Sequence, residues 1–288
     1  MTLLLIAPRC SAADPSLDFA PLGRLILAHF ASAPFPHPQR AAGHSYGTNV
    51  FSAAEHYQDN TVALFVPKGF RPHRKVDFVV HFHGWNNNVT NVLRKYRLPE
   101  QFSAAARNAI LIVPQGPFNA SDSFDGKLED SGGFTRLITE ALETLRANHI
   151  IDSNEPGRII LSGHSGGYEV ISTILAKGGL TKNISEVWLF DALYGKTERF
   201  ALWFDHHPGR FIDLYTTSGG TQDESSALMT ALTGNNVPYF SADETNATPA
   251  DLRKNHLIFL FSNQPHDEVI QNRDTFRHFL ESSSLPAL

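Results

Sequence analysis

The segment RIILSGHSGGY, residues 158–168, has the residue types and the spacing of a serine nucleophile. A largely apolar run ends on Gly163 and is followed at once by His164, Ser165, two more glycines and an amphipathic stretch. Where a strand turns sharply into a helix, the residue at the apex takes a strained backbone conformation and its neighbours must be small. Gly163 and Gly167 meet that requirement, so the pattern predicts that Ser165 attacks a carbonyl carbon.

A serine hydroxyl is a weak nucleophile until a base removes its proton, so this prediction requires a histidine after a later strand. Among 14 histidines, His266 in FSNQPHDEV follows the last apolar run and precedes the last amphipathic stretch. His256 lies before that run and His278 lies within the final stretch, which favours structural roles for both. We therefore expect His266 to act as general base and then as general acid.

Two aspartates are candidates for the residue that orients this histidine. Asp191 in VWLFDALYG ends the apolar run next after Ser165, and an aspartate in so apolar a context requires a specific partner. Asp223 in TTSGGTQDES follows the subsequent run, and its simpler interpretation is a residue of a turn or a helix start. The sequence favours Asp191 and leaves Asp223 as the alternative.

Acyl transfer also needs N–H donors for the charge that develops on the carbonyl oxygen. The N–H of Gly166, directly after the nucleophile, is one expected donor, and the N–H of Trp85, after the run VVHFHG, is the other. His81 and His83 lie two residues apart, on one face of a strand, and are alternative candidates for metal ligands. We find no Asp or Glu placed to complete such a site, so we expect neither a metal nor a cofactor.

Seven short apolar runs are the predicted strands that position these residues. Their hydrophobicity is continuous rather than alternating, which is typical of strands buried on both faces of a parallel sheet. They are residues 61–67, 77–83, 109–115, 158–163, 186–192, 210–216 and 257–262. Amphipathic segments between them predict helices, including residues 134–145, the stretch from Ser165 to Gly178, and residues 270–282. The sequence therefore predicts an α/β domain with a mostly parallel central sheet flanked by helices.

Composition and charge exclude several classes of partner. With 42% hydrophobic residues among 288, the chain is long enough to bury one large core. The formal net charge is −5 and the Lys and Arg residues form no stripe, so we expect no nucleic-acid partner. No later stretch is apolar for long enough to predict a membrane span.

The N-terminal residues differ in composition from the rest of the chain. Residues 1–13 resemble a signal-peptide remnant, which predicts a secreted or periplasmic protein, with the cytoplasm as the alternative. They contain Cys10, the single cysteine, so a disulfide and a cysteine nucleophile are both excluded. Residues 14–58 are rich in Pro, Ala and His without periodicity, and we expect an N-terminal extension lying over a single domain of residues 59–288.

The strand order and the motifs HFHGW, GHSGG and PHDEV resemble the α/β-hydrolase superfamily over about residues 60–285. The stretch VPKGFRPHRKVDFVVHFHGW is also similar in layout to esterases and polyester depolymerases with little or no cap. The resemblance implies a serine hydrolase that cleaves a carboxylic ester through an acyl-enzyme with Ser165, His266 and Asp191, without a cofactor. Asp191 departs from the majority pattern, in which the acid follows the next strand, although some lipases are similar to it.

The sequence leaves the substrate open. Short connections between the later strands predict an open site for a small-molecule or polymeric ester, and Trp85, Tyr168 and Tyr194 either line it or pack inside the protein. The acidic loop at residues 122–130 either faces the site or is solvated. A serine peptidase or amidase would share every motif, and a non-catalytic binding module on the same fold would need a broken triad or a blocked serine.

Overall fold

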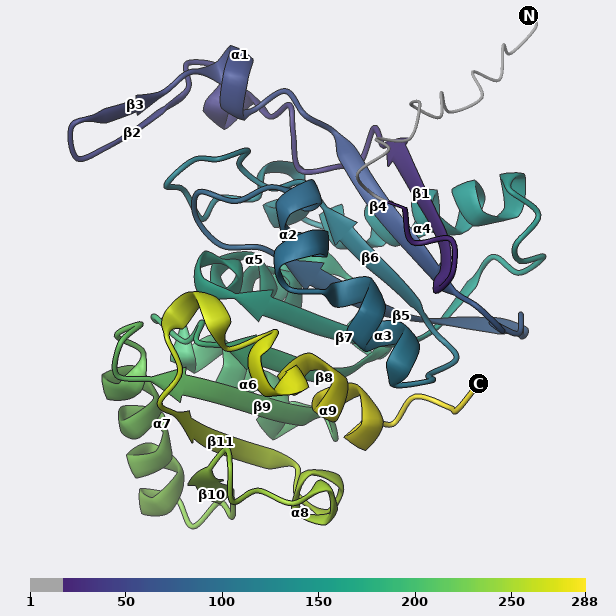
Figure 1. Ribbon diagram of the computed structural model, residues 1–288. Coiled ribbons are helices and arrows are strands. Elements are labelled where there is room, and N and C mark those ends of the chain that lie inside the picture. The colour runs from purple at the N-terminus through teal and green to yellow at the C-terminus, as the bar shows by residue number, and fades with distance from the viewer. Residues whose placement is uncertain (1–17) are drawn as a thin grey trace, which may run out of the picture.

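The computed structural model describes residues 18–288, and its centre is a nine-stranded sheet with helices on both faces (Figure 1). The strands run in the order β1-β4-β6-β5-β7-β8-β9-β11-β10. Their bounds are β1 (Gly23–His29), β4 (Thr61–Pro67), β5 (Lys75–Phe82), β6 (Ile110–Pro114), β7 (Glu155–His164), β8 (Ile184–Phe190), β9 (Arg210–Thr216), β10 (Phe240–Asp243) and β11 (Leu257–Ser262). β4 pairs antiparallel with β1 and β6, and every other pairing is parallel, so the expected mostly parallel sheet is confirmed.

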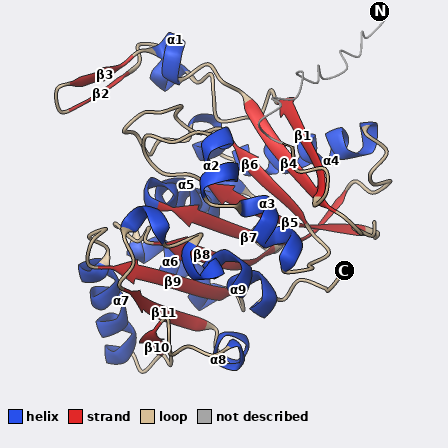
Figure 2. Ribbon diagram, in the orientation of Figure 1, coloured by secondary structure: helices blue, strands red, loops and turns tan. Residues whose placement is uncertain are grey.

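All seven apolar runs expected to be strands are strands of this sheet, because each is buried on both faces. Side chains of one strand alternate between two cores: in β7, Ile159 and Leu161 enter one core and Ile160 enters the other. The first core packs against α4 (Gly133–Ala147), α5 (Tyr168–Thr173), α6 (Thr197–His206) and α7 (Gln222–Gly234). The second packs against α2 (Val89–Lys95), α3 (Leu98–Ala104), α8 (Pro249–Lys254) and α9 (Thr275–Ser282), as Figure 2 shows.

Two of the expected helices differ from expectation. The helix after Ser165 is α-helical only over α5 and continues as a π-helix from Ile174 to Gly178. The final helix begins at Thr275 rather than near residue 270, because Arg273 and Asp274 have φ angles of 59° and 50°, which an α-helix does not accommodate. Within the described part of the chain, no helix combines the length and the apolarity needed to cross a bilayer.

The N-terminal segment contributes to the sheet as well as lying over it. Residues 23–29 were expected to belong to the extension, residues 14–58, but they form β1, which pairs with β4 at the edge of the sheet. An edge strand can form from a short apolar run, which is why the sequence did not predict it. The remainder includes a hairpin of β2 (His44–Tyr46) and β3 (Asn49–Phe51), which projects from the body, and α1 (Ala53–His56) (Figure 1). The possible signal-peptide remnant, residues 1–13 with Cys10, lies outside the described residues.

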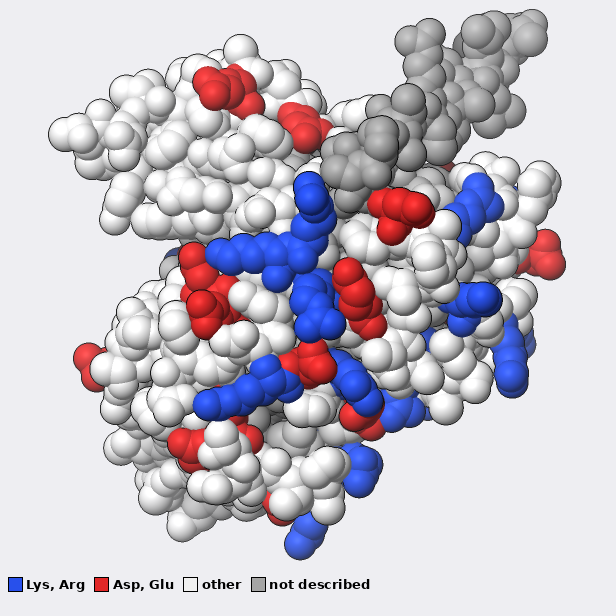
Figure 3. All heavy atoms as spheres, viewed as in Figure 1, with Lys and Arg blue, Asp and Glu red and all other residues white. Residues whose placement is uncertain are grey.

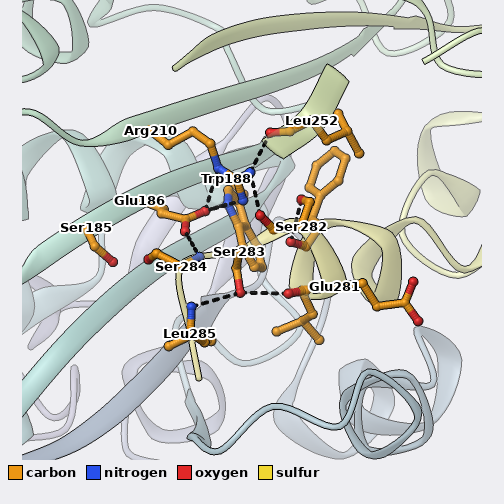
Figure 4. Close-up of polar contacts among 12 residues, drawn as sticks. Ser185, Glu186, Trp188, Arg210, Leu252, Glu281, Ser282, Ser283, Ser284 and Leu285 are labelled. Carbon is orange, nitrogen blue, oxygen red and sulfur yellow. Dashed lines mark hydrogen bonds and ion pairs between the residues drawn. The ribbon is translucent and has the colours of Figure 1, made fainter. Parts of the chain in front are cut away.

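A buried ion pair joins the C-terminal segment to the sheet, on the face that carries α8 and α9 (Figure 4). Glu186 of β8 accepts hydrogen bonds from Arg210 Nε of β9 at 2.8 Å, from Trp188 Nε1 at 3.0 Å and from the N–H of Ser284 at 2.7 Å. Arg210 also donates to the carbonyl oxygens of Leu252 and Ser282, at 2.7 and 2.9 Å. One pair of charges therefore satisfies backbone groups of α8, α9 and the C-terminal tail.

We predict that Arg210→Met lowers the free energy of unfolding by about 3–5 kcal/mol, because it leaves the Glu186 carboxylate buried without its counter-charge. Urea denaturation measures the loss. The double variant Glu186→Gln/Arg210→Met should lose less than the sum of the single variants, since its partners share one network. A loss below about 1 kcal/mol for Arg210→Met would be the size found for surface pairs and would contradict this account.

Candidate active site

Four residues singled out from the sequence lie at one edge of the sheet. Parallel strands present their carboxyl ends on the same side, where the connecting loops gather functional groups. Trp85 follows β5, Ser165 follows β7, Asp191 follows β8 and His266 follows β11. The structure thus assembles residues that are up to 181 positions apart (266 − 85).

Ser165 stands at the apex of a tight turn between β7 and α5. Its φ of 53° is in the left-handed region, a strained conformation for a non-glycine residue. A methyl group on Gly167 would come within 2.7 Å of the carbonyl oxygen of Phe82, so the turn can pack against β5 only with glycine there. The close approach of Phe82 therefore gives the predicted requirement for small neighbours a steric cause.

Asp191 is fully buried, and hydrogen bonds surround its carboxylate. Oδ1 accepts from the N–H of Thr216 at 3.1 Å and from the Thr221 hydroxyl, and Oδ2 accepts from the Thr216 hydroxyl at 2.7 Å and from His266 Nδ1 at 2.6 Å. Burial would raise the pKa of Asp191, but the hydrogen bonds from His266, Thr221 and Thr216 outweigh it and hold that pKa below its usual value.

The hydrogen bond between Asp191 and His266 fixes the histidine tautomer. An ionised carboxylate only accepts, so the proton between them belongs to His266 Nδ1, and Nε2 is left free to accept a proton. Asp223, the alternative acid, is exposed in the first turn of α7, where a carboxylate favours the helix N-terminus. The structure brings Asp191, and not Asp223, to the histidine.

The loop after β5 lies directly against the serine. A methyl group on Gly84 would come within 2.4 Å of the Cβ of Ser165 and 3.0 Å of its Oγ, so only glycine allows this approach. A methyl group on Gly166 would meet the Trp85 ring at 2.9 Å, which makes the two expected donor residues neighbours in space. The N–H of Trp85 makes no hydrogen bond with the residues that the structure describes.

His83 holds the peptide that carries this N–H. Its Nε2 accepts from the N–H of Gly116 at 3.1 Å, so its proton is on Nδ1, which donates to the carbonyl oxygen of Gly84 at 2.8 Å. In a trans peptide the C=O and the next N–H point in opposite directions, so this bond fixes the direction of the Trp85 N–H. Burial lowers the pKa of His83 and keeps its ring neutral.

Exposed aromatic side chains surround Ser165. Trp85 and Tyr194 are more than one third exposed, and Tyr46 from the projecting hairpin makes an edge contact with Trp85 at 4.7 Å between ring centroids. The Tyr194 hydroxyl donates to the carbonyl oxygen of Gly219 at 2.7 Å, and Tyr168 packs against Tyr194 at 5.9 Å. The end of the hairpin carries no Lys, Arg, Asp or Glu side chain (Figure 3), and its exposed apolar side chains are Tyr46 and Val50.

The acidic loop at residues 122–130 is anchored rather than solvated. Asp122 is buried and accepts from Arg40 Nε at 2.6 Å and from the Tyr57 hydroxyl at 3.0 Å, which ties the loop to the N-terminal segment. Asp125 is also buried, and this burial raises its pKa well above the usual value. Ser123 accepts a hydrogen bond from the Trp85 indole at 2.7 Å, so the loop supports the wall of the site.

One group of possible metal ligands occurs in the described part of the chain, with ligand atoms of His164, His266 and Asp267 within 4.8 Å of one another. Each already has a protein partner: Tyr96 for His164, Asp191 for His266, and Lys95 for Asp267 at 3.0 Å. All three groups are therefore engaged with other protein groups, and both ring nitrogens of His83 are likewise engaged.

Four residues of the site, Thr216, Thr221, Ser123 and Tyr46, were not predicted from the sequence. The two threonines lie in TTSGGTQDES, the same segment that raised Asp223, but a hydroxyl residue in a turn carries no signal of a partner 25 or 30 positions away. Tyr46 lies in the segment without periodicity, and nothing in the sequence relates it to Trp85.

Comparison with known proteins gives structural neighbours only. No protein-family model matches the chain, and no curated protein sequence matches it. The feruloyl esterase module of Clostridium thermocellum, solved with sinapinate, is similar with a TM-score of 0.56 and 13% identity, over 96% of this chain and 95% of that chain. The fluorophosphonate-binding serine hydrolase F of Staphylococcus aureus has a TM-score of 0.50 and 12% identity, over 89% of this chain and 99% of that chain.

A ferulic acid esterase is also similar, with a TM-score of 0.51 and 13% identity, over 77% of this chain and 91% of that chain. At 12–13% identity, structural similarity establishes the fold only, and the activity has to be inferred from the residues of the site. Together with the strand order and the turn that bears Ser165, these neighbours show that the chain has the α/β-hydrolase fold.

Proposed function

We propose that this protein is a serine hydrolase that cleaves carboxylic esters through an acyl-enzyme. Ser165 is the nucleophile, His266 is the general base and acid, and Asp191 orients the imidazole. The observation that carries the proposal is the 2.6 Å hydrogen bond between His266 Nδ1 and Asp191 Oδ2, at the sheet edge where a serine occupies a strained turn. Ser165, Asp191 and His266 follow three different strands, so closeness along the chain does not explain why they lie at one edge of the sheet.

The reaction proceeds in two halves. His266 Nε2 takes the proton of the Ser165 hydroxyl as Oγ bonds to the ester carbon, and it returns that proton to the alcohol oxygen as the ester bond breaks. A water molecule then gives a proton to His266 as its oxygen bonds to the acyl carbon. The bond from that carbon to Ser165 Oγ breaks, His266 returns the proton to Oγ, and the carboxylic acid is released. The Asp191 carboxylate stays ionised and stabilises the imidazolium that forms in each half.

The oxyanion is stabilised by the backbone N–H groups of Gly166 and Trp85. Two observations support this assignment: the close approach of Gly84 to Ser165, and the peptide direction set by His83. Fixed N–H dipoles need no reorganisation as charge develops, which is why such donors lower the barrier.

The substrate we propose is an ester with a bulky apolar or aromatic group. The described residues include five exposed large hydrophobic side chains, and four of them, Tyr46, Val50, Trp85 and Tyr194, lie on the hairpin and loops bordering Ser165. Rings of this kind bind flat apolar groups by edge and stacking contacts. Neighbours whose names specify feruloyl or ferulic acid ester cleavage are consistent with such a substrate.

The acid assignment predicts opposite results for two aspartates. Asp191→Asn should lower kcat on an activated aryl ester by roughly 10³- to 10⁴-fold, because the amide no longer fixes the His266 tautomer. Asp223→Asn, an exposed control, should leave kcat unchanged. Steady-state kinetics measure both, with the matched anilide as a test for amidase activity. Loss of activity in Asp223→Asn alone would show that the acid is misassigned.

The oxyanion assignment predicts that Gly84→Ala lowers kcat by roughly 10²- to 10³-fold, since the added methyl displaces the loop from Ser165. Gly234→Ala, at the end of α7, serves as the matched control, because no atom lies within 4 Å of the added methyl and the backbone there is not in the left-handed region. Circular dichroism checks the fold of each variant. Full activity of a folded Gly84→Ala protein would exclude this loop from the oxyanion site.

The substrate assignment predicts that Tyr46→Ala raises KM for a naphthyl ester by roughly 2- to 10-fold, the value of one aromatic contact, and leaves KM for an acetate ester of a small alcohol unchanged. Leu202→Ala, which removes an exposed apolar side chain from α6, is the control. An equal effect of Tyr46→Ala on both esters would argue against ring binding at this border.

A further inference from the structure

Another buried histidine, His164, directly precedes the proposed nucleophile and packs against the ring of the proposed base. It precedes Ser165 on the turn and is 2% exposed, and its ring lies 4.6 Å from the His266 ring with a tilt of 31°. Its Nε2 is 3.0 Å from the backbone carbonyl oxygen of His266, and its Nδ1 is 3.1 Å from the hydroxyl of Tyr96, which is 1% exposed. The mechanism above uses neither side chain.

The partners determine the direction of every hydrogen bond in this group. A carbonyl oxygen only accepts, so His164 Nε2 carries a proton and donates it to His266. Burial, reinforced by His266 nearby, lowers the pKa of His164 to about 4, so the ring is neutral and Nδ1 has no proton. Nδ1 therefore accepts a hydrogen bond from the Tyr96 hydroxyl, which keeps its proton.

The chain of hydrogen bonds begins in the loop that carries Trp85. The N–H of Asn88 donates to Asn87 Oδ1 at 3.0 Å, which fixes the orientation of the Asn87 amide. Asn87 Nδ2 then donates to the Tyr96 hydroxyl at 3.2 Å. Donation runs in one direction from Asn87 to Tyr96, to His164 and to the His266 backbone.

We propose that His164 is a positioning residue that holds the His266 loop in register with Ser165 and with the Trp85 loop. This role rests on the proposed function, because it places the base relative to the nucleophile. One hydrogen-bonded chain thereby joins the three segments that must act together. A base displaced by about 1 Å costs a large factor in rate even when every reacting group is present, which is why its carbonyl needs a fixed donor.

Three single variants and one double variant separate the parts of this role. His164→Phe keeps a flat ring beside His266 and removes both hydrogen bonds, and it should lower kcat roughly 10- to 100-fold with KM unchanged. His164→Gln retains an amide donor for the His266 carbonyl and should recover part of the loss. Tyr96→Phe removes only the hydroxyl, and the double variant Tyr96→Phe/His164→Phe should be no worse than His164→Phe, because both changes break one chain.

A spectroscopic measurement tests the role without using activity. Nitrogen NMR of histidine-labelled protein should show His164 protonated at Nε2 and not at Nδ1, and His266 protonated at Nδ1. His164→Phe and Tyr96→Phe should each shift the His266 ring signals. Tyr57→Phe, which removes another buried tyrosine hydroxyl, should leave them unchanged.

Two results would overturn the proposal. Unchanged kcat and unchanged His266 signals in folded His164→Phe would overturn the proposal, as would a His164 ring protonated at Nδ1. If His164→Phe does not fold, Tyr96→Phe decides by the same two readouts. If the wild-type protein hydrolyses no ester, the NMR result still supports or rejects the chain of hydrogen bonds, so failure of the proposed function is distinguishable.

Discussion

The buried carboxylate of Asp191 constrains the site more than any other group. A charge with no exposed surface is stable only where hydrogen bonds replace the lost water. Thr216 at the end of β9, Thr221 before α7 and His266 after β11 supply those bonds. Hydrogen bonds to one buried charge therefore hold three segments together at this edge of the sheet. One of the donors is the proposed catalytic base, His266.

Neutral histidines fix the backbone around that charge. His83 and His164 are both buried, burial lowers the pKa of each, and each donates to one carbonyl oxygen, that of Gly84 or that of His266. A neutral imidazole has one donor and one acceptor, so its partners determine its tautomer and it sets the direction of the peptide it contacts. Two side chains without a direct role in the chemistry thereby orient the proposed oxyanion donor and the proposed base.

Much of the fold could be predicted from the sequence, because the interior strands are buried on both faces and appear as continuous apolar runs. β1 and β10 could not, since both lie at sheet edges and are only partly buried: two of the seven residues of β1 are buried and none of the four in β10. The contact between Asp191 and His266 was predicted from strand ends and is present. The hydroxyl partners of Asp191 and the Tyr96–His164 pair were not, because side-chain hydrogen bonds between distant segments leave no periodic signal.

The most direct test of the central claim is the site of covalent modification by a fluorophosphonate probe, located by mass spectrometry on the purified protein. The account predicts one adduct, on Ser165, whose formation is abolished by His266→Ala and strongly slowed by Asp191→Asn. A folded wild-type protein that forms no adduct, or one modified at another serine with the same dependence on His266, would contradict it.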